Sequence, residues 1–124
     1  MGAGKSHVLQ YMHQHGYFPL LSFVIVDPDE IRNHFPEYDL YKSENPLHAG
    51  ELTRKEAGYI VEILTHAAMQ SGKNVLVDGS LRDWAWYEEY FACLKDEYAC
   101  VKISILHVDA PRDAIIERAT VSRI

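Results

Sequence analysis

Three short apolar runs, each followed directly by an aspartate, constrain the fold of this chain more than any other feature of its sequence. The runs are Leu20–Val26, Asn74–Val77 and Val101–Val108, and the aspartates are Asp27, Asp78 and Asp109. Near-continuous apolar runs rich in β-branched residues are typical of strands in a parallel sheet that is covered on both faces. The pattern therefore predicts three parallel strands.

Stretches with helical spacing lie between these runs. The longest extends from about Glu51 to Ser71, where apolar residues recur on one side, and Gly72 follows at the place of a left-handed C-terminal cap. Shorter helices are expected over three further stretches, from about Ser6 to His15, Trp84 to Leu94 and Pro111 to Val121. Strands that alternate with helices predict an α/β fold with right-handed crossovers.

Composition sets the class of protein. The 124 residues are 48% hydrophobic and 24% charged, as expected for one soluble globular domain over residues 1–124. The net charge of -6 argues against a nucleic-acid partner, because such proteins gather Lys and Arg on one face. The longest apolar run is too short to span a bilayer, and Cys93 and Cys100 show neither metal-site spacing nor a disulfide pattern. We therefore expect a cytoplasmic protein with free thiols and no membrane contact.

The N-terminus carries the second half of the phosphate-binding loop GxxxxGK[ST], in the residues Gly2, Ala3, Gly4, Lys5 and Ser6. In such a loop the glycines let the backbone approach the phosphates of ATP, the lysine binds the outer phosphates and the hydroxyl holds Mg²⁺. The helix that follows directs its positive N-terminal end at the anion. The motif predicts a P-loop NTPase-type parallel sheet with helices on both faces.

This motif is incomplete in the sequence. Its first glycine would lie before Met1, and no apolar strand precedes the loop. We therefore expect the N-terminal central strand of the sheet to be missing. If Met1 is the true start, we expect poor stability and no kinase activity, because the loop would have no strand to anchor it. Taken alone, the five residues are also compatible with a flexible N-terminus.

Polar residues follow two of the predicted strands. Ligands bind beyond the carboxyl ends of the strands in an open parallel sheet, so Asp27, Asp29, Asp78 and Ser80 are expected at one edge, together with the phosphate loop. A carboxylate at that edge can hold Mg²⁺ or accept the proton of an attacking hydroxyl. Asp27 is also well placed to cap a helix, because Pro28 follows it. The pattern alone leaves the roles of these carboxylates open.

Four segments resemble, in their order, those of the zeta-toxin family of P-loop kinases. The segments are Gly4-Lys5-Ser6, Val26-Asp27-Pro28-Asp29-Glu30-Ile31-Arg32 with Phe35-Pro36-Glu37-Tyr38, Val77-Asp78-Gly79-Ser80-Leu81-Arg82, and Ile116-Glu117-Arg118. Their approximate spacing matches the family over nearly the whole chain. The Asp-x-Asp segment joined to the later Asp-Gly-Ser-Leu-Arg segment is more specific than the phosphate loop.

The resemblance implies a kinase that uses ATP and Mg²⁺. Toxin members of the family phosphorylate the 3′-hydroxyl of UDP-N-acetylglucosamine, so a small hydroxyl-bearing substrate such as a UDP-sugar is expected, with an antitoxin-like protein as a further partner. Carried over by position, Lys5 would bind the outer phosphates of ATP and Ser6 the magnesium. Asp29 would be the general base that accepts the proton of the substrate hydroxyl.

The resemblance also implies a set of substrate-binding residues. Glu62 lies sixteen residues before Asp78, which is the family's spacing for a substrate-contacting Glu on the long helix. Asp78, Ser80 and Arg82 match the family's substrate-binding turn, with Asp where some members have Glu.

The family's lid arginines close on the phosphates, and Arg118 would be the first of them. Arg123 is a loose candidate for the second. The chain stops before the family's remaining C-terminal elements. We therefore expect this piece to lack what it needs to work alone.

Two other interpretations remain open. The same loop occurs in other small-molecule kinases and in polynucleotide kinases, although the net charge of -6 counts against a nucleic-acid groove. Outside the enzymes, the alternative is a nucleotide-binding or antitoxin-binding module without turnover. The fold by itself does not identify the substrate.

Overall fold

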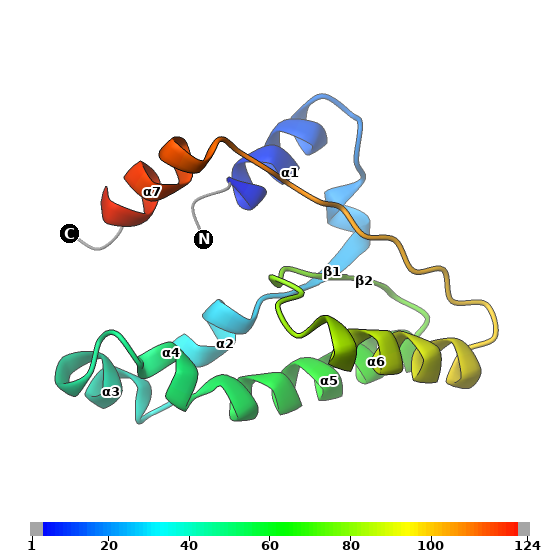
Figure 1. Cartoon of the computed structure of the whole chain (residues 1–124). Helices are drawn as coiled ribbons and strands as arrows, with labels where there is room; N and C mark the ends of the chain where they lie inside the picture. Colours follow the sequence, from blue (N-terminus) through cyan, green and yellow to red (C-terminus); the bar gives the residue numbers. More distant parts are fainter. Residues whose placement is uncertain (1–3, 122–124) are drawn as a thin grey trace. The chain divides into compact units, whose positions relative to one another are not determined.

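Residues 4–121 are described by the computed structural model, and they form two compact units (Figure 1). The larger unit comprises residues 22–99. The smaller unit comprises residues 4–21 together with residues 100–121. The chain therefore runs from the smaller unit into the larger one and back again.

The larger unit is built around a parallel pair of strands. Strand β1 (Phe23–Val26) pairs with strand β2 (Asn74–Val77), with Phe23 opposite Asn74 and Val26 opposite Val77. Helix α5 (Arg54–Gln70) lies between the strands in sequence and packs against both. Parallel strands need such a crossover, because a tight turn joins only antiparallel neighbours. The predicted parallel pairing of these two runs is confirmed.

Helix α5 begins later than the sequence predicted. A short helix, α4 (Ala49–Leu52), precedes it, and Thr53 separates the two. The buried Thr53 hydroxyl donates a hydrogen bond to the carbonyl of Ala49 at 2.9 Å. A threonine side chain that bonds to the preceding turn competes with the helical hydrogen bonds and bends a helix, which explains the break.

The end of α5 has the predicted left-handed cap. Gly72 has a φ of 68°, and its N–H donates to the carbonyl of Met69 at 3.0 Å. The N–H of Lys73 donates to the carbonyl of Ala68 at 2.9 Å. These two bonds form a Schellman motif, in which glycine is favoured because it has no Cβ to clash at positive φ. The cap ends α5 so that the chain can enter β2.

Three further helices complete the described part of the larger unit, namely α2 (Pro28–Asn33), α3 (Tyr38–Glu44) and α6 (Trp84–Glu97). Helix α2 packs against α5. Helix α6 begins at the predicted residue, where the Asp83 carboxylate accepts a hydrogen bond from the N–H of Trp86 at 3.4 Å. It continues one turn beyond its predicted end.

The core of the larger unit is small. Its most buried residues are Val26, Ala49, Thr53, Ala57, Val61, Thr65, Ala68 and Leu94. Most of these side chains are small, so larger apolar groups remain at the surface. Ile63 of α5 is 62% exposed and Trp84 of α6 is 72% exposed.

Two helices form the regular part of the described smaller unit, α1 (Lys5–Gln14) and α7 (Arg112–Val121). Both were predicted, and their ends lie within one residue of the predicted ones. Helix α1 ends in a second Schellman motif, in which Gly16 has a φ of 71° and the N–H of Tyr17 donates to the carbonyl of Met12 at 2.8 Å.

The third predicted strand is wrong. Residues 101–108 form neither a helix nor a strand, and the side chains of Ile105 and Leu106 are 62% and 51% exposed. A strand requires hydrogen bonds to a neighbouring strand, and the sheet of the described residues contains β1 and β2 alone. The first predicted strand is also shorter, because residues 20–22 form a 3₁₀ turn, η1 (Leu20–Ser22).

Two expectations drawn from composition concern the cysteines and the membrane. Cys93 and Cys100 are free thiols on the surface, as predicted. Among the helices of residues 4–121, none combines the length and the apolar character needed to cross a membrane.

Candidate functional site

The carboxyl ends of β1 and β2 lie side by side at one edge of the sheet. Val26 pairs with Val77, and the N–H of Asp78 donates to the carbonyl of Val26 at 3.0 Å. The residues that follow the strands, Asp27 and Asp78, are therefore neighbours. The prediction that these two residues share one edge is confirmed within the larger unit.

Asp27 uses its carboxylate to start helix α2. Its Oδ1 accepts hydrogen bonds from the N–H of Asp29 at 2.8 Å and from the N–H of Glu30 at 3.5 Å. Pro28 occupies the first helical position, where a missing N–H removes no helical hydrogen bond. Asp27 is therefore a helix cap, which is the simpler of the two interpretations that the sequence allowed.

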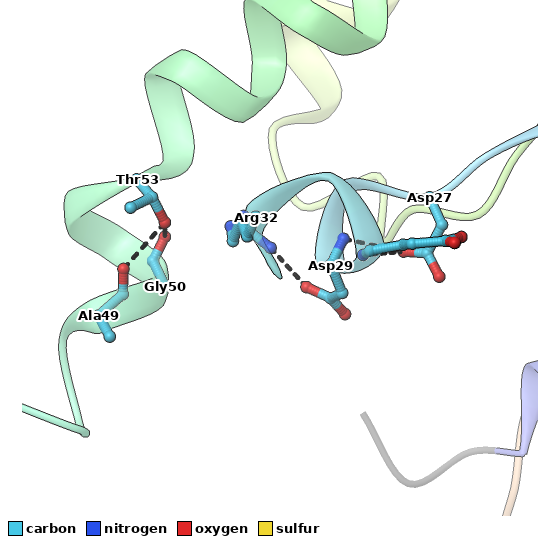
Figure 2. A network of polar contacts seen from close by, with 7 residues as sticks. Asp27, Asp29, Arg32, Ala49, Gly50 and Thr53 are labelled. Carbon is cyan, nitrogen blue, oxygen red and sulfur yellow. Dashed lines mark hydrogen bonds and ion pairs between the residues drawn. The ribbon is translucent and has the colours of Figure 1, made fainter. Parts of the chain in front are cut away.

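Asp29 presents its carboxylate at the surface of α2. Its side chain is 73% exposed, whereas the side chain of Arg32, one turn later, is only 14% exposed. The Nη1 of Arg32 forms an ion pair with the Oδ1 of Asp29 (Figure 2). Asp29 is thus held by one oxygen and remains accessible, which suits a group that receives a proton from a bound hydroxyl.

A hollow of about 230 Å³ lies beside Asp27. It is lined by residues of β1, α2 and α5, namely Ile25, Val26, Asp27, Glu30, Ile31, His34 and Leu64. Pockets that enclose drug-sized ligands hold roughly 300 to 1,000 Å³, so this hollow can receive only one group of a larger ligand.

Glu62 lies on α5 close to Tyr90 of α6. Burial raises the pKa of Tyr90 to about 12, and the negative charge of Glu62 adds to the effect, while the nearby Thr65 hydroxyl acts in the opposite direction. Within the described residues, neither the Tyr90 nor the Thr65 hydroxyl has a hydrogen-bond partner of normal geometry. Glu62 therefore lies half-buried, near enough to Tyr90 for its charge to act on that hydroxyl.

The turn after β2 contains Asp78, Ser80 and Arg82 of the predicted substrate-binding set. A Cβ on Gly79 would lie 3.4 Å from the Tyr87 hydroxyl, so α6 approaches this turn closely. Leu81 has a φ of 50°, a left-handed conformation that costs a residue with a Cβ roughly 1 to 2 kcal/mol. Such strain is often found at functional sites, because the surrounding structure must hold it in place.

Ion pairs connect the end of this turn to the start of α5. Arg82 pairs with Glu51 at 3.9 Å, and Arg54 pairs with Asp83 at 3.8 Å and with Glu51 at 3.7 Å. All four side chains are exposed, so each pair stabilises the turn by no more than about 1 kcal/mol. Glu51 and Arg54 could not be predicted from the sequence as partners of this turn, because nothing in a local pattern signals a pair across about thirty residues.

In the smaller unit, the start of α1 is arranged for an anion. Gly4 is the N-cap, with a φ of 85°, and no described side chain caps the helix. The first turn contains no acidic residue, and it holds the half-buried Lys5 and the exposed Ser6. The first N–H groups of a helix have no partner within it, so they can bind phosphate oxygens. Gly2 and Ala3 lie outside the described residues.

Arg118 of α7 lies next to this helix start. A Cβ on Gly4 would lie 3.5 Å from Arg118 Nη1, so the guanidinium stands beside the last glycine of the phosphate loop. Arg118 and Lys5 thus place positive charge at the N-terminal end of α1, whose dipole has the same sign. Arg123, the loose candidate for a second lid arginine, lies outside the described residues.

The residues at the start of α1 fit Mg²⁺ bound together with ATP. Residues 4–121 contain no group of three or more His, Cys, Asp or Glu side chains that could hold a metal ion. Mg²⁺ in kinases needs few protein ligands, because phosphates and water fill most of its coordination positions. The hydroxyl of Ser6 in the first turn of α1 can supply one such oxygen.

Among the comparisons with known proteins, the comparison with protein-family models gives a match. The protein-family model described as Zeta toxin matches residues 1–111, which is most of the chain. No curated protein and no solved structure matches the chain.

Proposed function

The chain belongs to the zeta toxin family, a family of P-loop kinases, and we propose that it transfers the γ-phosphoryl group of ATP to a hydroxyl of a small molecule. The observation that carries this proposal is the position of Arg118 beside Gly4, at the start of α1. A guanidinium, a lysine and the N–H groups at the start of a helix together form a strong site for phosphate.

The phosphate end of the reaction is assigned to the smaller unit. We assign Gly2, Ala3 and Gly4 to the phosphate-binding loop from their sequence, Lys5 to the outer phosphates and Ser6 to Mg²⁺. Arg118 offsets the negative charge that develops on the transferred group. Mg²⁺-ATP, when bound, would supply the phosphoryl group itself.

The acceptor end is assigned to the larger unit. Asp29 accepts the proton of the acceptor hydroxyl as its oxygen forms the new bond to phosphorus, and ADP leaves with the electrons of the broken bond. Glu62, Asp78, Ser80 and Arg82 contact the acceptor. Their carboxylates and hydroxyl suit the hydroxyl and amide groups of a sugar, and the exposed Arg82 suits a diphosphate.

A UDP-sugar such as UDP-N-acetylglucosamine is therefore the acceptor we propose. It offers a sugar hydroxyl, an amide and a diphosphate in one molecule. ATP and nucleotide sugars are made in the cytoplasm, which is where we place the protein. An antitoxin-like protein is the macromolecular partner that the family relation suggests.

A phosphotransfer assay on the complete gene product tests the proposal. With Mg²⁺, radiolabelled ATP and UDP-N-acetylglucosamine, we expect a labelled UDP-sugar, and Lys5→Ala should weaken ATP binding because the loop loses its charge. Lys95→Ala, at an exposed lysine of α6, is the matched control.

The outcomes of this assay differ for each alternative. Transfer of label to another small hydroxyl compound would support kinase activity but would reject the UDP-sugar as the acceptor. ATP binding without transfer to any acceptor would support a nucleotide-binding module instead. Unchanged ATP affinity in Lys5→Ala would reject the assignment of Lys5 to a phosphate-binding loop.

A further inference from the structure

We propose that Arg32 is a positioning residue that fixes the carboxylate of Asp29 for proton transfer, an inference that rests on the proposed function of Asp29 as the base. The two residues lie one turn apart on α2, and their ion pair joins Arg32 Nη1 to Asp29 Oδ1 (Figure 2). The other carboxylate oxygen is left for the acceptor hydroxyl.

The two side chains of this ion pair differ in burial, and the difference indicates which of them positions the other. The Arg32 side chain is 14% exposed and the Asp29 side chain is 73% exposed. Arg32 belongs to the helix that packs against α5, so its stem is held by the protein. Because the arginine is anchored and the aspartate is not, the arginine sets the position of the carboxylate.

The burial of Arg32 is unfavourable by itself. Its Nε is buried and has no hydrogen-bond partner within the described residues. Burying a polar donor without a partner costs free energy, and a surface location would avoid that cost. The cost is understandable if the guanidinium is needed at a defined place, as a group that orients a reacting carboxylate would be.

The backbone of Asp29 is fixed independently of Arg32. Its N–H donates to Asp27 Oδ1 at 2.8 Å, and Asp27 itself follows β1 at the edge of the sheet. Asp29 is therefore held at its backbone by the helix cap and at its side chain by Arg32. A carboxylate held at two points loses rotational freedom, which favours a reactive geometry with the acceptor.

A second ion pair with the same sequence spacing provides a comparison. Arg54 pairs with Glu51 at 3.7 Å, also three residues apart, but both side chains are exposed, at 48% and 61%. This pair joins α4 to α5 across the break at Thr53, and an exposed ion pair contributes no more than about 1 kcal/mol. If the Arg32 pair were only a stabilising contact of this kind, removing Arg32 would lower stability and leave the rate of phosphotransfer unchanged.

Kinetic measurements on the complete gene product test the inference, with UDP-N-acetylglucosamine as the acceptor probe. Arg32→Met, which keeps an apolar stem, should lower kcat roughly 10- to 100-fold while the KM for ATP stays within about twofold. Arg32→Lys should recover part of the loss, because an ammonium can still reach the carboxylate. Lys95→Met, at the exposed lysine of α6, should leave kcat unchanged.

A second measurement does not need turnover. In ¹⁵N spectra of the arginine side chains, the ion pair should slow rotation of the Arg32 guanidinium and give separate Nη signals. Asp29→Asn should merge these signals, while the Arg54 signals stay as they are. Merged Arg32 signals in the unaltered protein would contradict the inference.

The inference and the proposed function fail in different ways. Full kcat in Arg32→Met together with an inactive Asp29→Asn would reject the positioning role of Arg32 and support Asp29 as the general base. An active Asp29→Asn would reject both. Equal losses in Arg32→Met and Arg32→Lys, with lowered melting temperatures, would show that Arg32 serves the fold alone.

Discussion

The first turns of α1 and α2 are built from opposite kinds of residue. Helix α1 starts at a glycine with positive φ, has no acidic residue in its first turn, and no described side chain caps it. Helix α2 is capped by Asp27 and carries Asp29 and Glu30 in its first turn. At both helix starts the first N–H groups find no partner within the helix itself, and both have the same positive dipole end.

The difference shows two ways of satisfying those groups. The start of α2 is satisfied from within the chain, so the cap contributes to stability and Asp29 is displayed on a fixed support. At the start of α1, Lys5 and Arg118 lie alongside N–H groups for which the helix itself supplies no partner, and we propose that a ligand binds there. A ligand that binds only the folded state stabilises it, so ATP should protect α1 more than α2 in hydrogen exchange.

The largest expected effect comes from Asp29. Asp29→Ala should lower the rate of phosphotransfer roughly 10²- to 10⁴-fold, as loss of a general base does, and leave ATP affinity unchanged. Single-turnover kinetics and equilibrium ATP binding measure the two quantities. Asp96→Ala, at an exposed aspartate of α6, is the control and should remain active. Unchanged turnover in Asp29→Ala would remove the functional difference between the two helix starts.

The next effect concerns the glycine at the start of α1. Gly4 has a φ of 85°, so Gly4→Ala costs roughly 1 to 2 kcal/mol in the conformation that faces the phosphates, and ATP affinity should fall about tenfold. Isothermal titration measures the affinity. Gly58→Ala is the control, because Gly58 lies within α5 and an added Cβ would have no neighbour within 4 Å. That control should bind ATP normally and gain about 0.5 to 1 kcal/mol of stability.

A smaller effect is expected at the start of α2. Asp27→Ala removes the cap and should lower the free energy of unfolding by about 1 kcal/mol, whereas Asp27→Asn should keep most of it. Urea unfolding followed by tryptophan fluorescence measures this loss. Glu37→Ala is the control, since Glu37 is the N-cap of α3 but its side chain makes no capping hydrogen bond. Equal losses at both positions would contradict the capping role of Asp27.

The smallest effect is predicted for Tyr90. Within residues 4–121 its hydroxyl has no partner of normal geometry, so Tyr90→Phe should change stability near neutral pH by less than about 0.5 kcal/mol. The pKa of Tyr90 is raised to about 12 from an ordinary value of 10.0, so the folded state holds this proton more tightly than the unfolded state.

The sign of the pH dependence follows from that difference. The contribution of Tyr90 is fully present below pH 10 and is lost as the pH rises toward about 12. Tyr90→Phe should therefore reduce the fall in stability over this range. The unaltered protein is the reference, and identical profiles for the two proteins would contradict the burial of Tyr90.

Features set by neighbouring residues could be predicted from the sequence. The caps at Asp27 and Gly72 and the helices α1, α6 and α7 depend on contacts within a few residues, and the structure has them as predicted or within one turn. The parallel pairing of β1 with β2 followed from two apolar runs and the helix between them. The catalytic and binding roles given to the site residues remain predictions.

Features that depend on distant residues could not be predicted in the same way. Residues 101–108 have the apolar pattern of a strand, but a strand also needs a hydrogen-bonded neighbour. The break at Thr53 and the pair between Glu51 and Arg82 depend on how α4, α5 and the turn after β2 meet. No local pattern contains that information.

The sequence by itself determined where the chain turns, caps its helices and places its carboxylates along the strands, because those choices rest on backbone geometry and hydrogen bonds between near neighbours. Only the tertiary structure decided that Arg32 is buried while Asp29 is exposed, that Arg118 stands beside Gly4, and that Glu62 lies near Tyr90. Burial and charge proximity are properties of packed elements. A carboxylate becomes a candidate base only when packing has fixed its surroundings.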